Sequence, residues 1–188
     1  MATSPVLDVI SRRYSCRAFS DQRLDDDVVE AIVTAGLHAP SAVNRQPWRF
    51  IVVRDANVLA QLNQTGMALL EDADPAGFAR AQSRGGTLTY GAPVVVVIAR
   101  QNIEGRYSPD LDVGIAASHM VLAAASLGVD SCIAAMPGLA LSDASGAGLR
   151  ARIGWPEGFE FGLSVLLGYA SGAPNPGHPI DQSKVVFS

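Results

Sequence analysis

The sequence lacks most of the features that announce a specialised class of protein. Its 188 residues contain two cysteines, Cys16 and Cys132, whose separation fits neither a CxxC motif nor a zinc site. A chain without a disulfide framework fits a reducing compartment. The N-terminus has no apolar run of the kind found in secretory signals, and Asp8 lies where such a run would stand. We therefore expect a cytoplasmic protein.

Positive charge and long hydrophobic runs are also scarce. Lys184 is the only lysine, and 14 basic residues against 18 acidic ones leave a net charge of −4. A mildly acidic chain is a poor candidate for binding nucleic acid or an anionic membrane. The most apolar stretch, residues 113–129, is interrupted by Ser118 and His119 and is shorter than the roughly 20 residues that span a bilayer. We expect neither a nucleic-acid partner nor a membrane segment.

Motifs for several common chemistries are absent as well. No GxGxxG follows an expected strand, no Walker loop is present, and the run around Ser164 lacks the second glycine of a nucleophile elbow. The three histidines are scattered, without the spacing of a helical metal site. These absences argue against a Rossmann dinucleotide fold, a P-loop enzyme and a metal centre.

The sequence does have the composition of one globular domain. The hydrophobic fraction is 48% and the charged fraction 17%, and the length suits one core better than two, so we expect a single domain over residues 1–188. Strands are predicted near residues 49, 93, 129 and 161, and they alternate with helical patterns. This order predicts an α+β fold in which helices cover a small sheet.

Segments between the strands bear on assembly and on access to a site. Residues 109–127 form a helix that is apolar almost all round, and such a helix needs partners on every side. A second subunit is a natural source of that cover, so we expect one. Residues 57–70 are predicted as a helix, whereas residues 71–91 are rich in Asp, Gly, Ala and Arg. We expect the latter to form a mobile excursion that covers the substrate side, as a lid rather than a deep specific pocket.

A basic cluster near the N-terminus, residues 12–17 (RRYSCR), is the first positive signal for function. It falls where a predicted helix over residues 5–13 gives way to a loop. Guanidinium groups match phosphate oxygens, and a serine hydroxyl adds a neutral donor. The alternative is a solvated basic face at a helix C-terminus, where the helix dipole favours Arg. Taken alone, the cluster favours that alternative.

A second signal is the loop of residues 39–48 (APSAVNRQPW). Two prolines stiffen it, and the amide groups of Asn44 and Gln46 suit the edge of a flat heteroaromatic ring with carbonyls and ring nitrogens. Trp48 leads into the next strand and is expected to anchor the loop. The alternative is a structural loop whose polar groups bond its own backbone. For this loop alone, the two interpretations are about equal.

Together, and in this order, the two blocks are much more specific. The pattern RRYSCRAF followed by APSAVNRQPWRFIVV closely resembles the nitroreductase family of FMN-dependent oxidoreductases. The resemblance extends along nearly the whole chain, through YGAPV at residues 90–94, DVGIAA at 112–117 and LLGY at 166–169. It implies the family's dimeric fold, a small central sheet covered by helices with a long buried helix.

The resemblance implies a role for each residue of the first block. Arg13 would bind the FMN phosphate, and Tyr14 and Ser15 would contact the phosphate and the ribityl chain. Arg17 would lie near the pyrimidine edge of the flavin, where a cation stabilises the negative charge left by reduction. Where the family tail commonly has Lys or Arg, this chain has His178, which is only partly protonated at neutral pH.

The resemblance also implies that the second block comes from the other subunit of a homodimer, so that the active sites lie at the interface. The residues implied to line the flavin there are Pro40, Ser41, Ala42, Asn44 and Gln46. In the middle of the chain, Asn63 is a candidate for a further amide contact.

The implied reaction is ping-pong. NADH or NADPH reduces FMN and leaves, and a small-molecule acceptor such as a nitroaromatic or a quinone takes its place. The flavin carries the chemistry, so the sequence assigns no catalytic side chain. The absence of a Rossmann motif agrees with a nicotinamide that binds only transiently. The alternative, kept open by His178, is a non-catalytic flavin-binding protein for storage or sensing.

Overall fold

The computed structural model describes residues 4–103, 108–142, 144–173 and 179–187. The helices are α1 (Pro5–Arg12), α2 (Asp26–Leu37), α3 (Ala56–Ala73), α4 (Pro75–Gln82), α5 (Pro109–Ser126), α6 (Gly138–Ser142) and α7 (Ala147–Arg152). The strands are β1 (Trp48–Val53), β2 (Val94–Gln101), β3 (Asp130–Ala134) and β4 (Phe159–Gly168). Short 3₁₀ helices lie at Ala42–Asn44, Ala144–Gly146 and Gln182–Lys184.

The strands form one antiparallel sheet in the order β1-β2-β4-β3. Successive side chains of a strand point to opposite faces of its sheet. Accordingly, Val94, Val96 and Ile98 of β2 belong to one hydrophobic cluster, while Val95 and Val97 belong to another. The unbroken apolar run in the sequence therefore reflects a central strand that is covered by helices on both faces.

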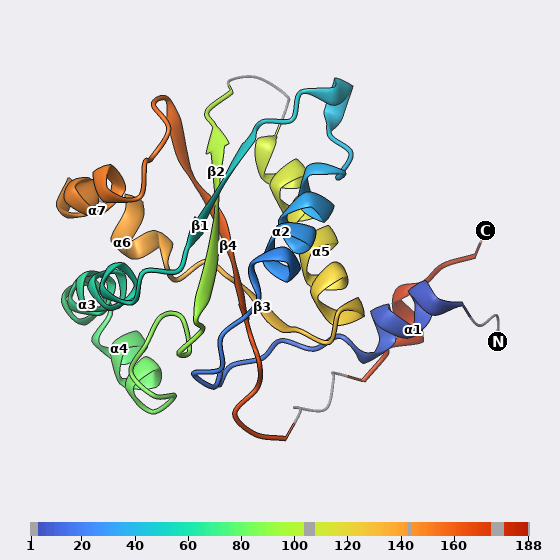
Figure 1. Ribbon diagram of the computed structural model, residues 1–188, viewed down its shortest axis with the longest axis horizontal. Coiled ribbons are helices and arrows are strands. Elements are labelled where there is room, and N and C mark those ends of the chain that lie inside the picture. Colours follow the sequence, from blue (N-terminus) through green and yellow to red (C-terminus); the bar gives the residue numbers. More distant parts are fainter. Residues whose placement is uncertain (1–3, 104–107, 143, 174–178, 188) are drawn as a thin grey trace.

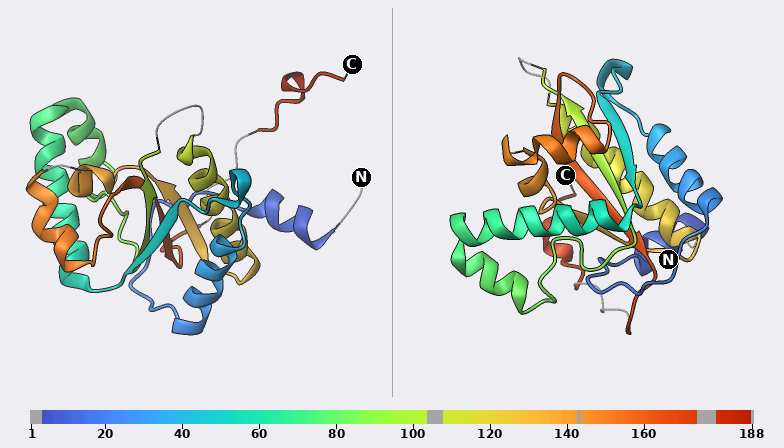
Figure 2. Two further views of the ribbon diagram at one scale, coloured as in Figure 1. Left: turned by 90° about the horizontal axis from the view of Figure 1, so that it is seen from above. Right: turned by 60° about the vertical axis from the view of Figure 1, so that its left-hand side comes forward.

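The helices form a layer on each face of the sheet (Figures 1 and 2). α2 and α5 pack on one face, where Ile32 and Met120 are fully buried. α3, α6 and α7 cover the other face with Leu62, Leu141 and Leu149. The α+β architecture expected from the sequence is confirmed, and the expected helix over residues 109–127 is α5.

α5 is apolar on most sides but is only partly covered by its own chain. Val113, Ala116 and Met120 are buried, whereas Leu111 is 71% and Ile115 37% exposed. The sequence reasoning that this helix needs cover from elsewhere is consistent with these exposed side chains. The second subunit itself stays a prediction.

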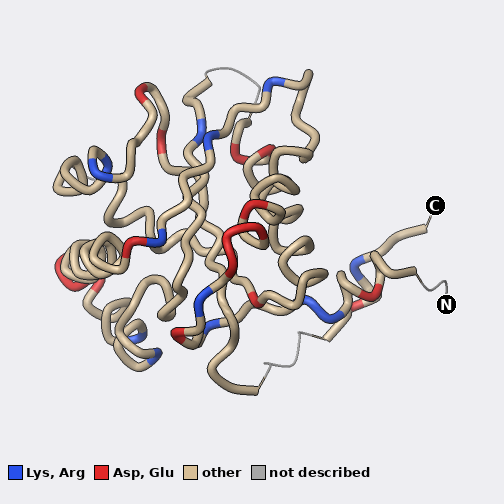
Figure 3. Tube along the Cα trace, in the orientation of Figure 1, with Lys and Arg blue, Asp and Glu red and all other residues tan. Residues whose placement is uncertain are grey.

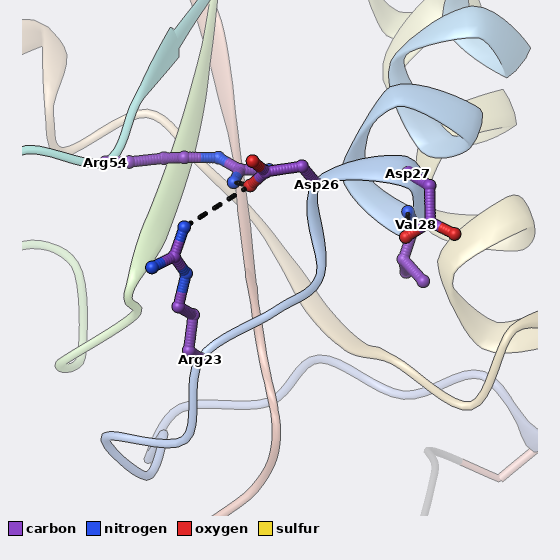
Figure 4. Close-up of polar contacts among 5 residues, drawn as sticks. All are labelled: Arg23, Asp26, Asp27, Val28 and Arg54. Carbon is purple, nitrogen blue, oxygen red and sulfur yellow. Dashed lines mark hydrogen bonds and ion pairs between the residues drawn. The ribbon is translucent and has the colours of Figure 1, made fainter.

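α2 begins at an acidic turn that is tied to the end of β1. Asp26 and Asp27 lie in the first turn, near the positive end of the helix dipole. Figure 4 shows two arginine side chains directed at the Asp26 carboxylate. Arg54 forms an ion pair with it, and the Nη2 atom of Arg23 lies 3.7 Å from the Oδ1 atom of Asp26. These exposed pairs orient the entry to α2 and add little to stability.

Residues 71–91, expected as a mobile excursion, contain a regular helix, α4. α3 continues beyond its predicted end at Leu70 as far as Ala73, and the Asp74 N–H donates to the Leu70 carbonyl at 2.8 Å. Asp74 then caps α4, since its carboxylate accepts the Gly77 N–H at 2.9 Å. The Asp-rich and Gly-rich composition therefore marked a helix cap and not an absence of structure.

α1 and the described end of the chain project from the body of the molecule (Figures 1 and 2). α1 is amphipathic and has no buried residue, with Val6 65% and Ile10 47% exposed. Near the C-terminus, Phe187 is 94% exposed. No described helix is both long enough and apolar enough to cross a membrane. The exposed apolar side chains form surfaces that this chain alone does not cover.

Candidate cofactor site

The segment that follows α1, residues 13–17, runs beside the edge strand β3. Ser15 and Ser131 form a parallel bridge, and the Cys16 N–H donates to the Ser131 carbonyl at 2.9 Å. Beyond the segment, the Ser20 N–H donates to the Tyr169 carbonyl at 2.8 Å. These backbone hydrogen bonds fix the path of the segment, and hence the positions from which its side chains project.

Positive charge gathers in this segment, just beyond the end of α1 (Figure 3). Arg12 forms an ion pair with Asp8 one helical turn earlier, with Nε and Oδ2 3.3 Å apart. Arg13 and Arg17 form no ion pair with any residue that the structure describes. Two guanidinium groups without an acidic partner make the segment well suited to an anion.

The thiol of Cys132 lies within the electrostatic influence of this segment. Cys132 is buried on β3, and burial raises the pKa of its thiol. Arg17 opposes this increase in pKa, as do a hydrogen bond from the Ser15 side chain and, more weakly, Arg13. Both arginines and the Ser15 hydroxyl therefore influence the Cys132 thiol, although Arg13 and Arg17 line different cavities.

Two cavities flank the segment. One of about 180 Å³ lies between Arg13 and residues 128–131, which lead from α5 into β3. The other, of about 240 Å³, lies between residues 14–18 and residues 170–173. Pockets for drug-sized ligands and cofactors usually measure roughly 300–1,000 Å³. Each cavity is smaller than that, so one chain presents only part of such a site.

The Tyr14 hydroxyl forms a hydrogen bond with another side chain of the protein, that of Asp130. The pKa of Tyr14 is raised, first by burial and then by its hydrogen bond to the Asp130 carboxylate. The same carboxylate accepts the Ala170 N–H at 2.9 Å. Asp130 thus ties the basic segment to the chain beyond β4. Sequence reasoning missed this residue because both of its partners are distant along the chain.

The loop of residues 40–46 is well structured although most of it is exposed. Val43, Asn44 and Gln46 have left-handed backbone conformations, with φ of 47°, 55° and 48°, which non-glycine residues rarely adopt. The Ser41 hydroxyl accepts the Gln46 N–H, and the Asn44 side-chain oxygen accepts the Gln46 side-chain amide, both at 2.9 Å. Some polar groups of the loop are thus hydrogen-bonded within the loop itself, while the side chains of residues 42–46 are exposed.

A buried carboxylate holds this loop at the first turn of α5. Asp112 is 4% exposed and accepts the Ala42 N–H at 3.2 Å. Arg13, in contrast, shares a cavity with Gly128, beyond the other end of α5. The 18 residues of α5 span about 27 Å. Within one chain, the two predicted blocks therefore lie at opposite ends of α5 and do not meet (Figure 1).

Comparison with known proteins identifies the family of this chain. The sequence profile of the nitroreductase family matches residues 10–169. The chain belongs to the nitroreductase family. A relative from Archaeoglobus fulgidus, provisionally named NADH dehydrogenase/NAD(P)H nitroreductase, is 31% identical over 166 residues, which cover 87% of this chain and 84% of the relative.

Solved structures of nitroreductases share the fold over the whole chain. The enzyme from Desulfitobacterium hafniense, crystallised with bound FMN, is 38% identical, with a TM-score of 0.90 and 100% coverage of both chains. The enzyme from Bacteroides fragilis, also with bound FMN, is 26% identical, with a TM-score of 0.88 and coverage of 99% and 100%. The family expected from the two sequence blocks is confirmed.

Other positions suggested by the nitroreductase resemblance have different surroundings. His178 lies outside the described residues. Asn63 is engaged within the protein, since its side-chain oxygen accepts the Leu88 N–H at 2.9 Å and its amide donates to the Thr89 hydroxyl at 3.1 Å. In the described ranges, no group of three or more His, Cys, Asp or Glu side chains could hold a metal ion.

Proposed function

We propose that this member of the nitroreductase family is an FMN-dependent enzyme that passes electrons from NADH or NADPH to a nitroaromatic, a quinone or a similar small acceptor. The observation that carries the proposal is the pair Arg13 and Arg17, which lie beside Ser15 without an acidic partner among the described residues. An FMN phosphate is the kind of anion that such a group of donors accepts. Support comes from the two solved relatives, which were crystallised with FMN.

The residues of the segment fit the parts of this cofactor. Arg13 and Ser15 would hold the phosphate, and Arg17 would place a positive charge at the pyrimidine edge of the flavin. Tyr14, which Asp130 holds, keeps the segment in position. His178 would add a further, partly protonated contact. Each of these assignments is a part of the proposal.

Bound FMN supplies two-electron transfer. For a nitro group the balance is R–NO₂ + NAD(P)H + H⁺ → R–NO + NAD(P)⁺ + H₂O, and for a quinone the same two electrons and two protons give the quinol. In the proposed ping-pong sequence, the nicotinamide leaves before the acceptor enters the same space. The protein then needs to bind, orient and shield the two substrates in turn, and no side chain is assigned as an acid or base.

The proposed active sites lie between two copies of the chain. The loop that carries Pro40, Ser41, Ala42, Asn44 and Gln46 is about the length of α5 away from Arg13 in the same chain. A second copy can bring its own loop to the segment, and it can also cover the exposed apolar side chains of α1. A symmetric pair of chains would create two equal sites.

Anaerobic absorbance measurements test this function directly. The purified protein is expected to be yellow, to be bleached by NADH or NADPH, and to regain its colour when a nitroaromatic or a quinone is added. Parallel double-reciprocal plots are expected for a ping-pong sequence, and intersecting lines would contradict it. Tight FMN that neither nicotinamide reduces would support the non-catalytic flavin-binding alternative. A protein that takes up no added FMN would contradict both.

A further inference from the structure

A cavity of about 190 Å³ lies beside α4 and is lined mostly by residues 74–90, which belong to the segment that the sequence predicted to be a mobile excursion. Apolar and aromatic side chains form part of its lining, and two arginines belong to it as well. These side chains are those of Leu70, Leu88, Tyr90, Met136, Arg80 and Arg84, and the Asp74 carboxylate also lines the cavity. The combination of an apolar wall, an aromatic ring and positive charge defines the chemistry that the cavity can recognise.

The cavity adjoins the segment that carries the proposed flavin site. The Tyr90 carbonyl accepts the Phe19 N–H at 3.1 Å, and Phe19 lies two residues after Arg17. On another side, Met136 follows the end of β3, the strand beside which Ser15 runs. The cavity therefore lies near Phe19, two residues beyond the segment that is proposed to bind the cofactor.

The two arginines of the cavity differ in whether a described carboxylate pairs with them. Arg80 pairs with Asp74, with Nη2 and Oδ2 3.3 Å apart. The Arg84 guanidinium forms no ion pair or side-chain hydrogen bond within the described part of the chain. One positive charge at the cavity is therefore left to attract an anion.

We propose that this cavity binds a one-ring aromatic electron acceptor with an anionic substituent, and that Arg84 holds the anion. The inference rests on the proposed flavin-dependent reduction, and it specifies the chemical class of the electron acceptor in that reaction. A cavity of about 150 Å³ accommodates benzene, so the volume here suits a single substituted ring. Leu70, Leu88 and Met136 supply apolar contacts for the ring, and a guanidinium can hold a carboxylate through two parallel hydrogen bonds.

The test compares a charged and a neutral acceptor of the same size in the holoenzyme. Steady-state kinetics with 4-nitrobenzoate and 4-nitrobenzyl alcohol are measured for the wild type, for Arg84→Gln and for a control, Arg152→Gln. Arg152 is an exposed arginine of α7 that lies near Asp55 and does not line the cavity. Arg84→Gln is expected to raise KM for 4-nitrobenzoate about tenfold, the scale of one charged hydrogen bond. Its kcat and its KM for the alcohol are expected to change by less than about twofold.

Three results would overturn the inference. The first is a KM for 4-nitrobenzoate that is unchanged in Arg84→Gln, and the second is an equal rise in KM for both acceptors. The third is a rise in KM for NADPH alone, which would assign Arg84 to binding of the electron donor. The control is expected to behave as the wild type, and flavin absorbance together with Tm verifies that each variant is folded.

If the wild type reduces neither acceptor, the proposed function fails while this inference remains measurable. Isothermal titration of the protein as purified with 4-nitrobenzoate then decides it. A Kd about tenfold weaker in Arg84→Gln supports the site, and equal affinities or no binding in the wild type contradict it.

Discussion

Arg12 and Arg13 are neighbours in the sequence, but the structure gives them different surroundings. Arg12 is the last residue of α1 and completes an ion pair with Asp8 on an exposed face of the helix. Arg13 is already extended, with φ of −63° and ψ of 132°, and it lines a cavity beside Ser131 of β3 that Arg12 also lines. The ion pair with Asp8 therefore distinguishes Arg12 from Arg13, which has no ion pair among the described residues.

This difference leads to a prediction for cofactor binding. Arg13→Ala is expected to weaken FMN binding by about 1.5–3 kcal/mol, the range of a hydrogen bond to a charged group. Arg12→Ala removes the same charge one residue away and is expected to cost less than about 0.5 kcal/mol. Fluorescence titration of the apoprotein with FMN measures both values. Equal losses would mean that the general positive charge, and not Arg13, holds the phosphate.

The hydrogen bond between Tyr14 and Asp130 predicts an effect of pH on stability. In the folded protein the Tyr14 pKa lies above its ordinary value of 10.0 because of burial and of Asp130. The folded protein keeps this proton at a pH where the unfolded chain has lost it. The contribution of Tyr14 to stability is therefore complete below about pH 10 and declines as the pH rises above that value.

Tyr14→Phe is expected to lack this decline. Urea unfolding between about pH 8 and pH 11 measures the free energy of unfolding of both proteins. The difference between the two curves should narrow toward the alkaline end, because the wild type begins to lose a contribution that the variant never had. Curves that stay parallel would show that Tyr14 is not protected in the folded state.

At the scale of elements, periodic apolar patterns predicted the strands of the sheet and α5. The hydrogen bonds that join loops to distant helices could not be predicted in this way. The run Val94–Ile98 marked a central strand because both of its faces are buried. α4 was missed because Asp74 and Pro75 suit a turn as well as the start of a helix. The tether from Asp112 was missed because its partner, Ala42, is 70 residues away, and no local pattern reveals such a pair.

The same reasoning explains which parts of the site were predictable. Residues 13–17 are adjacent in the sequence, so one motif contains them all. The cavity beside α4 joins Leu70, Arg84 and Met136, which come together only in the folded chain. A sequence motif can therefore predict where a cofactor binds, whereas the shape of the neighbouring acceptor space depends on tertiary packing.

The tether between α5 and the loop leads to a prediction about stability. Asp112→Ala removes the acceptor of the Ala42 N–H and is expected to lower the free energy of unfolding by about 1–3 kcal/mol. Asp110 lies in the same turn, is exposed, and pairs with Arg100 at 2.8 Å. Asp110→Ala is therefore a matched control with an expected cost below about 1 kcal/mol.

Urea unfolding measures both of these costs, and amide hydrogen exchange reports on the loop itself. Faster exchange in residues 42–46 is expected for Asp112→Ala alone. If Asp110→Ala accelerated exchange in the loop to the same extent, the first turn of α5 as a whole, and not the Asp112 carboxylate, would hold the loop.

At the scale of the whole molecule, the uncovered surfaces and the incomplete site have one common explanation. α1 and the C-terminal tail expose Val6, Ile10 and Phe187, and neither cavity beside the basic segment is large enough for a complete cofactor. The loop of residues 40–46 lies at the far end of α5. A symmetric pair of chains would cover the apolar side chains and would bring each loop to the segment of the other chain.

This assembly predicts that a charge on α1 affects cofactor binding from a distance. Ile10→Glu is expected to dissociate the homodimer, and the monomers are expected to lose FMN because the loop of a second copy no longer covers it. Ser11→Glu adds the same charge at an exposed polar position about 100° further around the helix, and it should stay dimeric with its flavin. Light scattering after size exclusion gives the mass, and absorbance gives the flavin content. A monomeric Ile10→Glu protein that retained its flavin would show that one chain completes the site, and a monomeric wild type would contradict the dimer itself.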